Sequence, residues 1–174
     1  MAIKNLSQSK SKVSVTLSSF YGELAKVQDN QRLLVIVTHG FVELLVNTVI
    51  DSNCKHGKKK ITSNHRDFSH SVKLVLLSEL GLLDNKLYQI LDWFRKLRNR
   101  AAHEVFFELT PDDIEFANKS MNRFLPVEVE PIVDDLDRFC KLLIGTIWNK
   151  HLDVLLPIFE PKLHSKGKDK EKGT

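Results

Sequence analysis

The stretch NQRLLVIVTHGFVELLVNTVID, residues 30–51, contains the most apolar segment of the chain. Its β-branched run at 35–37 would suit a strand, but the length of the pattern, with Gly40 as its only breaker, favours a helix. Asn30 is a suitable N-cap for that helix. The apolar positions form a face wide enough for a helix buried at the centre of a bundle, and they are Leu33, Leu34, Ile36, Val37, Phe41, Leu44, Leu45 and Val49.

The same stretch is not predicted to cross a membrane. A bilayer helix needs about 20 mostly apolar residues, whereas His39, Gly40, Glu43 and Asn47 interrupt this one. The N-terminal sequence MAIKNLSQSK lacks the apolar core of a secretory signal. We therefore expect a cytoplasmic protein without membrane contact.

Helical spacing of apolar residues recurs along the rest of the chain. No alternation of strands with helices and no glycine-rich phosphate loop is present. The sequence therefore predicts an all-α fold, a single bundle of five or six helices. The expected helices besides the one over 30–51 cover residues 15–27, 68–80, 84–103, 110–124 and 130–156.

Two of these helices carry clear local signals. Thr110 and Pro111 form a strong helix start, because threonine caps the first turn and proline there loses no hydrogen bond. Gly81 lies where a C-cap glycine is expected after the helix over 68–80. The predicted apolar face of that helix consists of Val72, Val75, Leu76 and Leu80.

The two ends of the chain differ in composition from the part between them. Residues 1–13 are a polar stretch that we expect to form a flexible arm. Residues 161–174 contain five lysines and only two acids, and so contribute most of the net charge of +4. Such a tail cannot bury apolar surface, and we expect it to be disordered. The predicted folded domain therefore covers residues 14–160.

A basic segment, SNCKHGKKKITSNHR at residues 52–66, has five cations, two histidines and no acid. We interpret it as a loop with Gly57 at its turn. It is either an ordinary exposed loop or a phosphate-contacting one, because clustered lysines bind nucleic acid without regard to sequence. In the second case Lys58, Lys59 and Lys60 would bind RNA backbone.

Residues 94–103, FRKLRNRAAH, end the predicted helix over 84–103. The apolar face expected for that helix consists of Leu87, Ile90, Leu91, Phe94, Leu97 and Ala101. Asn99 and His103 are one turn apart and share a face, and Arg98 flanks them. Ala101 and Ala102 keep the last turn slim, so that a polyanion can approach His103. The pattern alone is more typical of a solvated basic face that ends in a histidine favoured by the helix dipole.

The sequence gives little indication of a disulfide bond or a metal site. Cys54 and Cys140 are far apart and belong to no CxxC pair, and no HExxH motif occurs. We expect no metal site and no cofactor.

The run from Arg98 to His103 resembles the R-x4-6-H signature of the HEPN superfamily, with Asn99 as the polar residue that follows the arginine. The surroundings resemble the mannitol operon repressor-like branch, and the likeness covers about residues 30–110. Its further parts are Phe68, the LGLL sequence at 80–83, Tyr88, and the HGFVELL sequence at 39–45, where Glu43 occupies a position that is often acidic.

This resemblance implies an HEPN-like helical bundle that dimerises, with the motif helices of both subunits meeting at a cleft. Active members of the superfamily are metal-independent endoribonucleases, common among toxins and antiviral defence proteins. The implied roles are acid/base for His103, phosphate binding for Arg98 and orientation for Asn99. Glu43 would either hold Arg98 or act as a buried partner. Further RNA contacts would come from Arg95, Arg100 and Lys58–Lys60.

Cleavage of RNA through its own 2′-hydroxyl needs a base and an acid, and histidine can act as either near neutral pH. Each chain has one His103, so a twofold homodimer would supply both groups. The resemblance also implies an antitoxin of nucleotidyltransferase type as a possible partner. The alternative is a non-catalytic transcriptional regulator or adaptor similar to the mannitol operon repressor.

Overall fold

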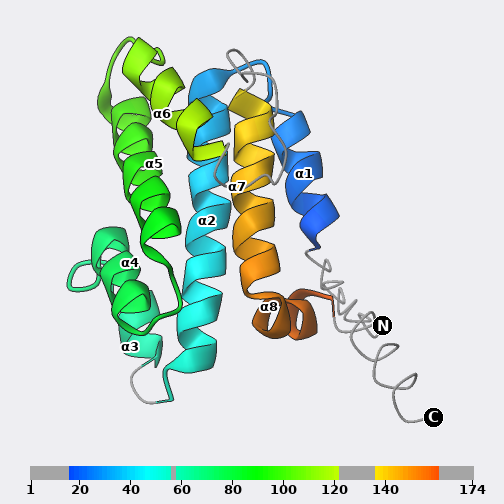
Figure 1. The fold of residues 1–174 in the computed structure, drawn as a ribbon, viewed down its shortest axis with the longest axis vertical. Coiled ribbons are helices and arrows are strands. Elements are labelled where there is room, and N and C mark those ends of the chain that lie inside the picture. Colours follow the sequence, from blue (N-terminus) through cyan, green and yellow to red (C-terminus); the bar gives the residue numbers. More distant parts are fainter. Residues whose placement is uncertain (1–15, 56–57, 122–135, 161–174) are drawn as a thin grey trace, which may run out of the picture.

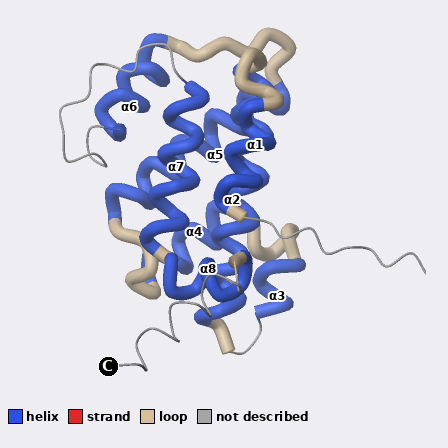
Figure 2. The backbone as a smooth tube through the Cα atoms, turned by 90° about the vertical axis from the view of Figure 1, so that its right-hand side faces the viewer, coloured by secondary structure: helices blue, strands red, loops and turns tan. Residues whose placement is uncertain are grey.

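The computed structural model describes residues 16–55, 58–121 and 136–160. All regular secondary structure in these residues is α-helical, as Figure 2 shows, and the predicted all-α bundle is confirmed. The predicted arm at 1–13, the tail at 161–174 and the expected helix start near residue 130 lie outside the described residues. The helices are α1 (Leu17–Ala25), α2 (Gln31–Asn53), α3 (Lys58–Ser63), α4 (His70–Glu79), α5 (Asn85–His103), α6 (Pro111–Met121), α7 (Leu136–Lys150) and α8 (Leu152–Phe159).

The predicted number of five or six helices is wrong, because the described residues alone contain eight. One additional helix, α3, lies within the segment predicted to be a loop, where Ile61 packs against the core and fixes a single short turn of helix. The second arises at His151, where the predicted last helix bends by 100° into α7 and α8. No glycine or proline marks that bend, and Pro157 lies inside α8 instead of after its end.

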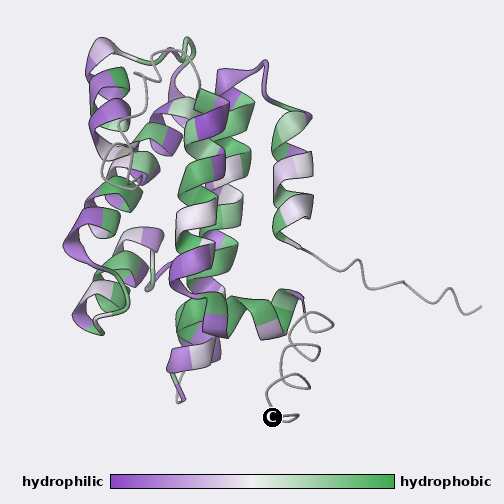
Figure 3. Ribbon diagram, turned by 45° about the vertical axis from the view of Figure 1, so that its right-hand side comes forward, coloured by the Kyte–Doolittle hydropathy of each residue, from purple (hydrophilic) through white to green (hydrophobic). Residues whose placement is uncertain are grey.

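Helix α2 occupies the centre of the bundle, between α5 and α7 (Figure 1). It also contacts α1, α3, α4 and α8. Asn30 caps its start by accepting a hydrogen bond from the Leu33 amide at 3.0 Å, as predicted. In Figure 3 hydrophobic residues gather on the central helices and on α8, while the outer helices carry more hydrophilic ones. The prediction of a central helix is therefore confirmed. Its predicted face is correct only in part, because Leu33 and Leu44 are 45% and 40% exposed, whereas Leu34, Leu45 and Val49 are buried.

Helix α2 also has the length and hydropathy of a membrane span, with a mean hydropathy of 2.0 over its most apolar window. Half of that window is buried inside the bundle, as in the core helix of a soluble protein. Helices α7 and α8 meet the same criteria only when counted together as one bent span. The expected absence of membrane contact stays a prediction.

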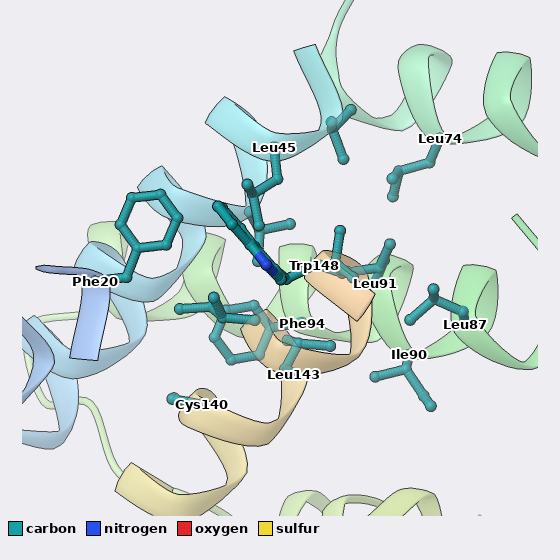
Figure 4. Close-up of a cluster of buried hydrophobic side chains, with 14 of the residues drawn as sticks. Phe20, Leu45, Leu74, Leu87, Ile90, Leu91, Phe94, Cys140, Leu143 and Trp148 are labelled. Carbon is teal, nitrogen blue, oxygen red and sulfur yellow. The ribbon is translucent and has the colours of Figure 1, made fainter. Parts of the chain in front are cut away.

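The core joins α1, α2, α4, α5 and α7, as the close-up in Figure 4 shows. Phe94 of α5 is fully buried and lies near Trp93 and Phe139, with ring centroids at 6.1 Å from each. On α5 the buried positions are Leu87, Ile90, Leu91, Phe94, Leu97 and Ala101, which is the predicted face. This face fixes the rotation of α5, and so decides where its arginines point.

The face predicted for the helix over 68–80 is wrong. Val72, Val75 and Leu80 are 44%, 45% and 50% exposed, whereas the neighbouring positions Lys73, Leu74 and Leu77 are buried. Both faces of α4 carry apolar residues, so its sequence does not specify which of them packs against the bundle. The choice matters because it places Lys73 in the interior, next to the candidate site.

Candidate functional site

Helix α5 begins and ends as the sequence predicts. Asp84 caps the start by accepting a hydrogen bond from the Leu87 amide at 2.9 Å. The helix ends at His103, after which the Glu104 amide donates to the Arg100 carbonyl at 2.9 Å. With its apolar face buried, α5 presents Arg95, Arg98 and Asn99 along one edge.

These three residues line a pocket of about 340 Å³ between α2, α4 and α5, which we call the histidine–arginine pocket. Four of the predicted site residues, including Glu43 of α2, therefore come together in the folded chain. The remaining lining residues were not predicted as site residues from the sequence. They are His39 from α2, His65 from the α3–α4 connection, and Ser69, His70 and Ser71 from the start of α4.

His103 does not line this pocket and is exposed at the end of α5. It follows Arg98 by five residues, which corresponds to a rotation of roughly 140° around the helix. Asn99, one turn before His103, is also exposed and borders the pocket. Within one chain, Asn99 therefore lies between Arg98, which lines the pocket, and His103, which does not.

Glu43 contacts other partners than the predicted one. Its Oε1 lies 3.6 Å from His65 Nδ1 and 3.9 Å from Lys73 Nζ. The Lys73 side chain is fully buried and also donates to the Thr62 carbonyl at 3.4 Å. Of the two roles considered for Glu43, the structure thus favours that of a partner to a buried group, here the ammonium of Lys73, over that of holding Arg98.

The three arginines of α5 have different surroundings. Arg95 donates two hydrogen bonds to Asp92, at 3.0 and 2.8 Å. Arg100 donates to Asp113 at 2.7 Å and to the Glu108 carbonyl at 3.0 Å, and so ties the segment after α5 to the start of α6. These hydrogen bonds occupy two of its guanidinium nitrogens, so a predicted RNA contact by Arg100 would compete with them.

Arg98 has no carboxylate partner among the residues that the structure describes. Its Nη1 donates to the amide oxygen of the neighbouring Asn99 at 3.2 Å. A guanidinium has five N–H donors, so most of those on Arg98 are free to bind an anion. Arg98 is therefore the residue of this surface that is best suited to contact a phosphate.

Two histidines form the inner wall of the histidine–arginine pocket. The rings of His39 and His70 lie 4.6 Å apart, centroid to centroid. His39 is 5% exposed, and its Nε2 has no hydrogen-bond partner. Both ring nitrogens of His70 are buried and also lack a partner. The rings therefore leave three buried nitrogen atoms unsatisfied.

Burial keeps both rings neutral at physiological pH. Desolvation, followed by the charge of Arg98, lowers the pKa of His39 from 6.5 to about 4. Desolvation, followed by the proximity of His39 and Lys73, lowers the pKa of His70 from 6.5 to about 3. A neutral imidazole has one N–H donor and one acceptor nitrogen, so each ring brings one donor to the wall of the pocket.

These shifts predict that the protein becomes less stable as the pH falls from 7 to 5. In the unfolded chain both histidines take up protons near pH 6.5, whereas in the folded chain they stay neutral down to about pH 4 and about pH 3. Each histidine lowers the free energy of unfolding by up to about 1.4 kcal/mol per pH unit in this window. His151, whose pKa burial also lowers, contributes with the same sign.

Urea unfolding at pH 7, 6 and 5 measures this dependence. We expect His70→Phe to flatten the slope, because the variant has one proton fewer to take up on unfolding. A stability that stays constant or increases as the pH falls over this range would contradict the assignment of two neutral buried histidines.

The lysines predicted to bind RNA are on or beside α3. Lys59 and Lys60 are exposed, and neither of them lines the histidine–arginine pocket. The predicted loop is thus partly helical, and α3 places these lysines just before His65, which does line the pocket. Their contact with RNA stays a prediction.

Comparison with protein-family models, with curated proteins and with solved structures finds no match to this chain. Within the described residues, no group of three or more His, Cys, Asp or Glu side chains is arranged to hold a metal ion.

Proposed function

We propose that this chain is an HEPN-type RNA-binding protein that cleaves RNA as a homodimer without a metal ion. The observation that supports this most is the guanidinium of Arg98, which has no carboxylate partner among the described residues and lies on the same helix as the exposed His103. Asn99 lies between them and already accepts a hydrogen bond from Arg98 at 3.2 Å. This combination offers a phosphate ligand and a titratable ring along one helix.

The reaction is an attack by the ribose 2′-oxygen on the adjacent phosphorus. A bond forms between O2′ and phosphorus while the bond from phosphorus to O5′ breaks. One imidazole takes the proton from O2′, and a second imidazolium gives a proton to O5′. Arg98 donates to the non-bridging phosphate oxygens, where negative charge increases in the transition state. The products carry a 2′,3′-cyclic phosphate and a 5′-hydroxyl.

The two imidazoles are proposed to be the His103 side chains of two subunits. The residues directly after His103 support a contact there, because Val105 and Phe106 are 80% and 89% exposed. Arg32 Nη2 donates to the carbonyls of Glu104 and Val105 at 2.7 and 2.9 Å, which fixes the backbone that carries this apolar pair. An exposed apolar patch on a fixed backbone is typical of an interaction surface.

The surrounding cations would bind the RNA backbone. Among the cations proposed for this role, the structure leaves Arg95, Arg100, Lys59 and Lys60 at least partly exposed. A cytoplasmic toxin or defence nuclease that is kept inactive by an antitoxin of nucleotidyltransferase type fits this proposal.

Incubation of the full chain with end-labelled RNA in EDTA tests the proposal. We expect fragments with 2′,3′-cyclic phosphate and 5′-hydroxyl ends, formed at a rate that EDTA does not change. Intact RNA after incubation with a folded, dimeric protein would contradict it. That result would favour the non-catalytic regulator or adaptor instead.

A further inference from the structure

The first turn of α4 faces the histidine–arginine pocket. Ser69 is its N-cap, and Ser69, His70 and Ser71 all line the pocket. The Ser69 hydroxyl accepts from the Val72 amide, whereas the amides of His70 and Ser71 have no acceptor within the helix. With ten residues, α4 also has the partial positive charge that an aligned helix places at its N-terminus.

The two buried histidines point to a ligand independently of this helix end. His39 is 5% exposed and lines the pocket, and its buried Nε2 has no hydrogen-bond partner. Both nitrogens of His70 lack a partner, so its single N–H has no acceptor within the described residues. A buried donor without an acceptor costs about 1–3 kcal/mol, which a ligand oxygen at this position would offset.

The charges around the pocket select an anion. Arg95 and Arg98 line the pocket, and the carboxylate of Asp92 engages Arg95. The buried Lys73 ammonium lies 3.9 Å from the Glu43 carboxylate. The positive charge of Arg98 is left without a carboxylate among the described residues. A metal cation at the two imidazoles would be repelled by these groups, whereas an acceptor-rich anion would meet guanidinium, amide and imidazole donors together.

We propose that the histidine–arginine pocket binds a phosphomonoester, held by the first-turn amides of α4, by Arg95 and Arg98, and by the N–H groups of His39 and His70. A phosphomonoester suits the pocket better than a phosphodiester, because its three terminal oxygens accept more hydrogen bonds and its charge approaches −2 near neutral pH. The source is either free phosphate or the 5′-phosphorylated end of an RNA. The site shares Arg98 with the proposed cleavage chemistry but not His103, which does not line it.

Calorimetric and NMR titrations of the full chain with inorganic phosphate test this site. We expect saturable binding with one phosphate per chain, and shifts in the ring-proton signals of His39 and His70. Both Arg95→Gln and His70→Phe are expected to weaken binding at least 10-fold. Lys96→Gln is the matched control, because Lys96 is on the same helix and contacts the same Asp92 but does not line the pocket.

A second titration separates the two sources of the phosphomonoester. It compares one oligoribonucleotide with a 5′-phosphate and with a 5′-hydroxyl. At least 10-fold tighter binding of the phosphorylated form assigns the site to RNA ends, whereas equal affinities, with inorganic phosphate still bound, assign it to free phosphate. A folded protein that shows no saturable binding of phosphate would overturn the proposal, because the pocket would then hold water alone.

The His103→Ala variant separates phosphate binding in the pocket from the proposed RNA cleavage. This variant is expected to lose RNA cleavage and to keep phosphate binding unchanged. Phosphate binding by a wild-type chain that never cleaves RNA would leave the phosphomonoester site standing and remove only the nuclease proposal. Cleavage of RNA by a chain that does not bind phosphate would keep the nuclease proposal and remove only the phosphomonoester site.

Discussion

His103→Ala is expected to lower the rate of RNA cleavage at least about 100-fold, because general acid–base catalysis contributes roughly 10²- to 10⁴-fold to such reactions. The side chain is exposed at the end of α5, so its removal should leave the fold unchanged. Single-turnover cleavage of a labelled RNA measures the loss. Lys96→Ala serves as the control, since Lys96 is an exposed cation of the same helix.

Arg98→Ala is expected to lower the same rate by about 10²- to 10³-fold, the usual effect of removing one donor that stabilises a developing negative charge. Arg98→Lys should restore only part of the rate, because an ammonium lacks the planar fork of a guanidinium. Cleavage by His103→Ala and Arg98→Ala at the rate of the wild type would show that the motif of α5 does not carry the reaction.

Phe94→Ala is expected to lower the free energy of unfolding by about 3–5 kcal/mol, because it leaves a cavity at a fully buried position among Trp93 and Phe139. Phe94 is one residue before Arg95 and one turn before Arg98, so the same packing sets the direction of both guanidinium groups. Urea unfolding followed by circular dichroism measures the change.

Phe106→Ala is the matched control for this prediction. Phe106 is 89% exposed, and its replacement should change the free energy of unfolding of the isolated chain by less than about 0.5 kcal/mol. Equal losses for the two variants would contradict the packing of α5 described above. If Phe106→Ala weakens the dimer but leaves the free energy of unfolding of the isolated chain unchanged, the proposed contact beside His103 is supported.

The helices whose polar and apolar faces are distinct could be predicted from the sequence. On α5 the apolar residues fall on one side, and the predicted face, start and end all agree with the structure. Helix α4 has apolar residues on both sides, and there tertiary packing selects Leu74 and Leu77 over Val72 and Val75. The bend at His151 has no local signal in the sequence, and α8 contacts α2 beyond it.

The candidate site was predictable in part, for a similar reason. Arg98, Asn99 and Glu43 were found through the motif and its surroundings, and the structure brings them to one pocket. His39 is one turn before Glu43 on the same helix, and no role in the site was predicted for it from the sequence. The pairing of His39 with His70, and the burial of Lys73 against Glu43, depend on the rotation of α4.

The most direct test of the central claim, that one active site needs His103 from two chains, is the cleavage rate of a mixed dimer. Wild-type and His103→Ala chains with different affinity tags are co-expressed, and the mixed dimer is purified through both tags. Because base and acid would come from different subunits, we predict that the mixed dimer has less than about a tenth of the wild-type rate. A mixed dimer with half of the wild-type rate would contradict the account, because each chain would then carry a complete site of its own.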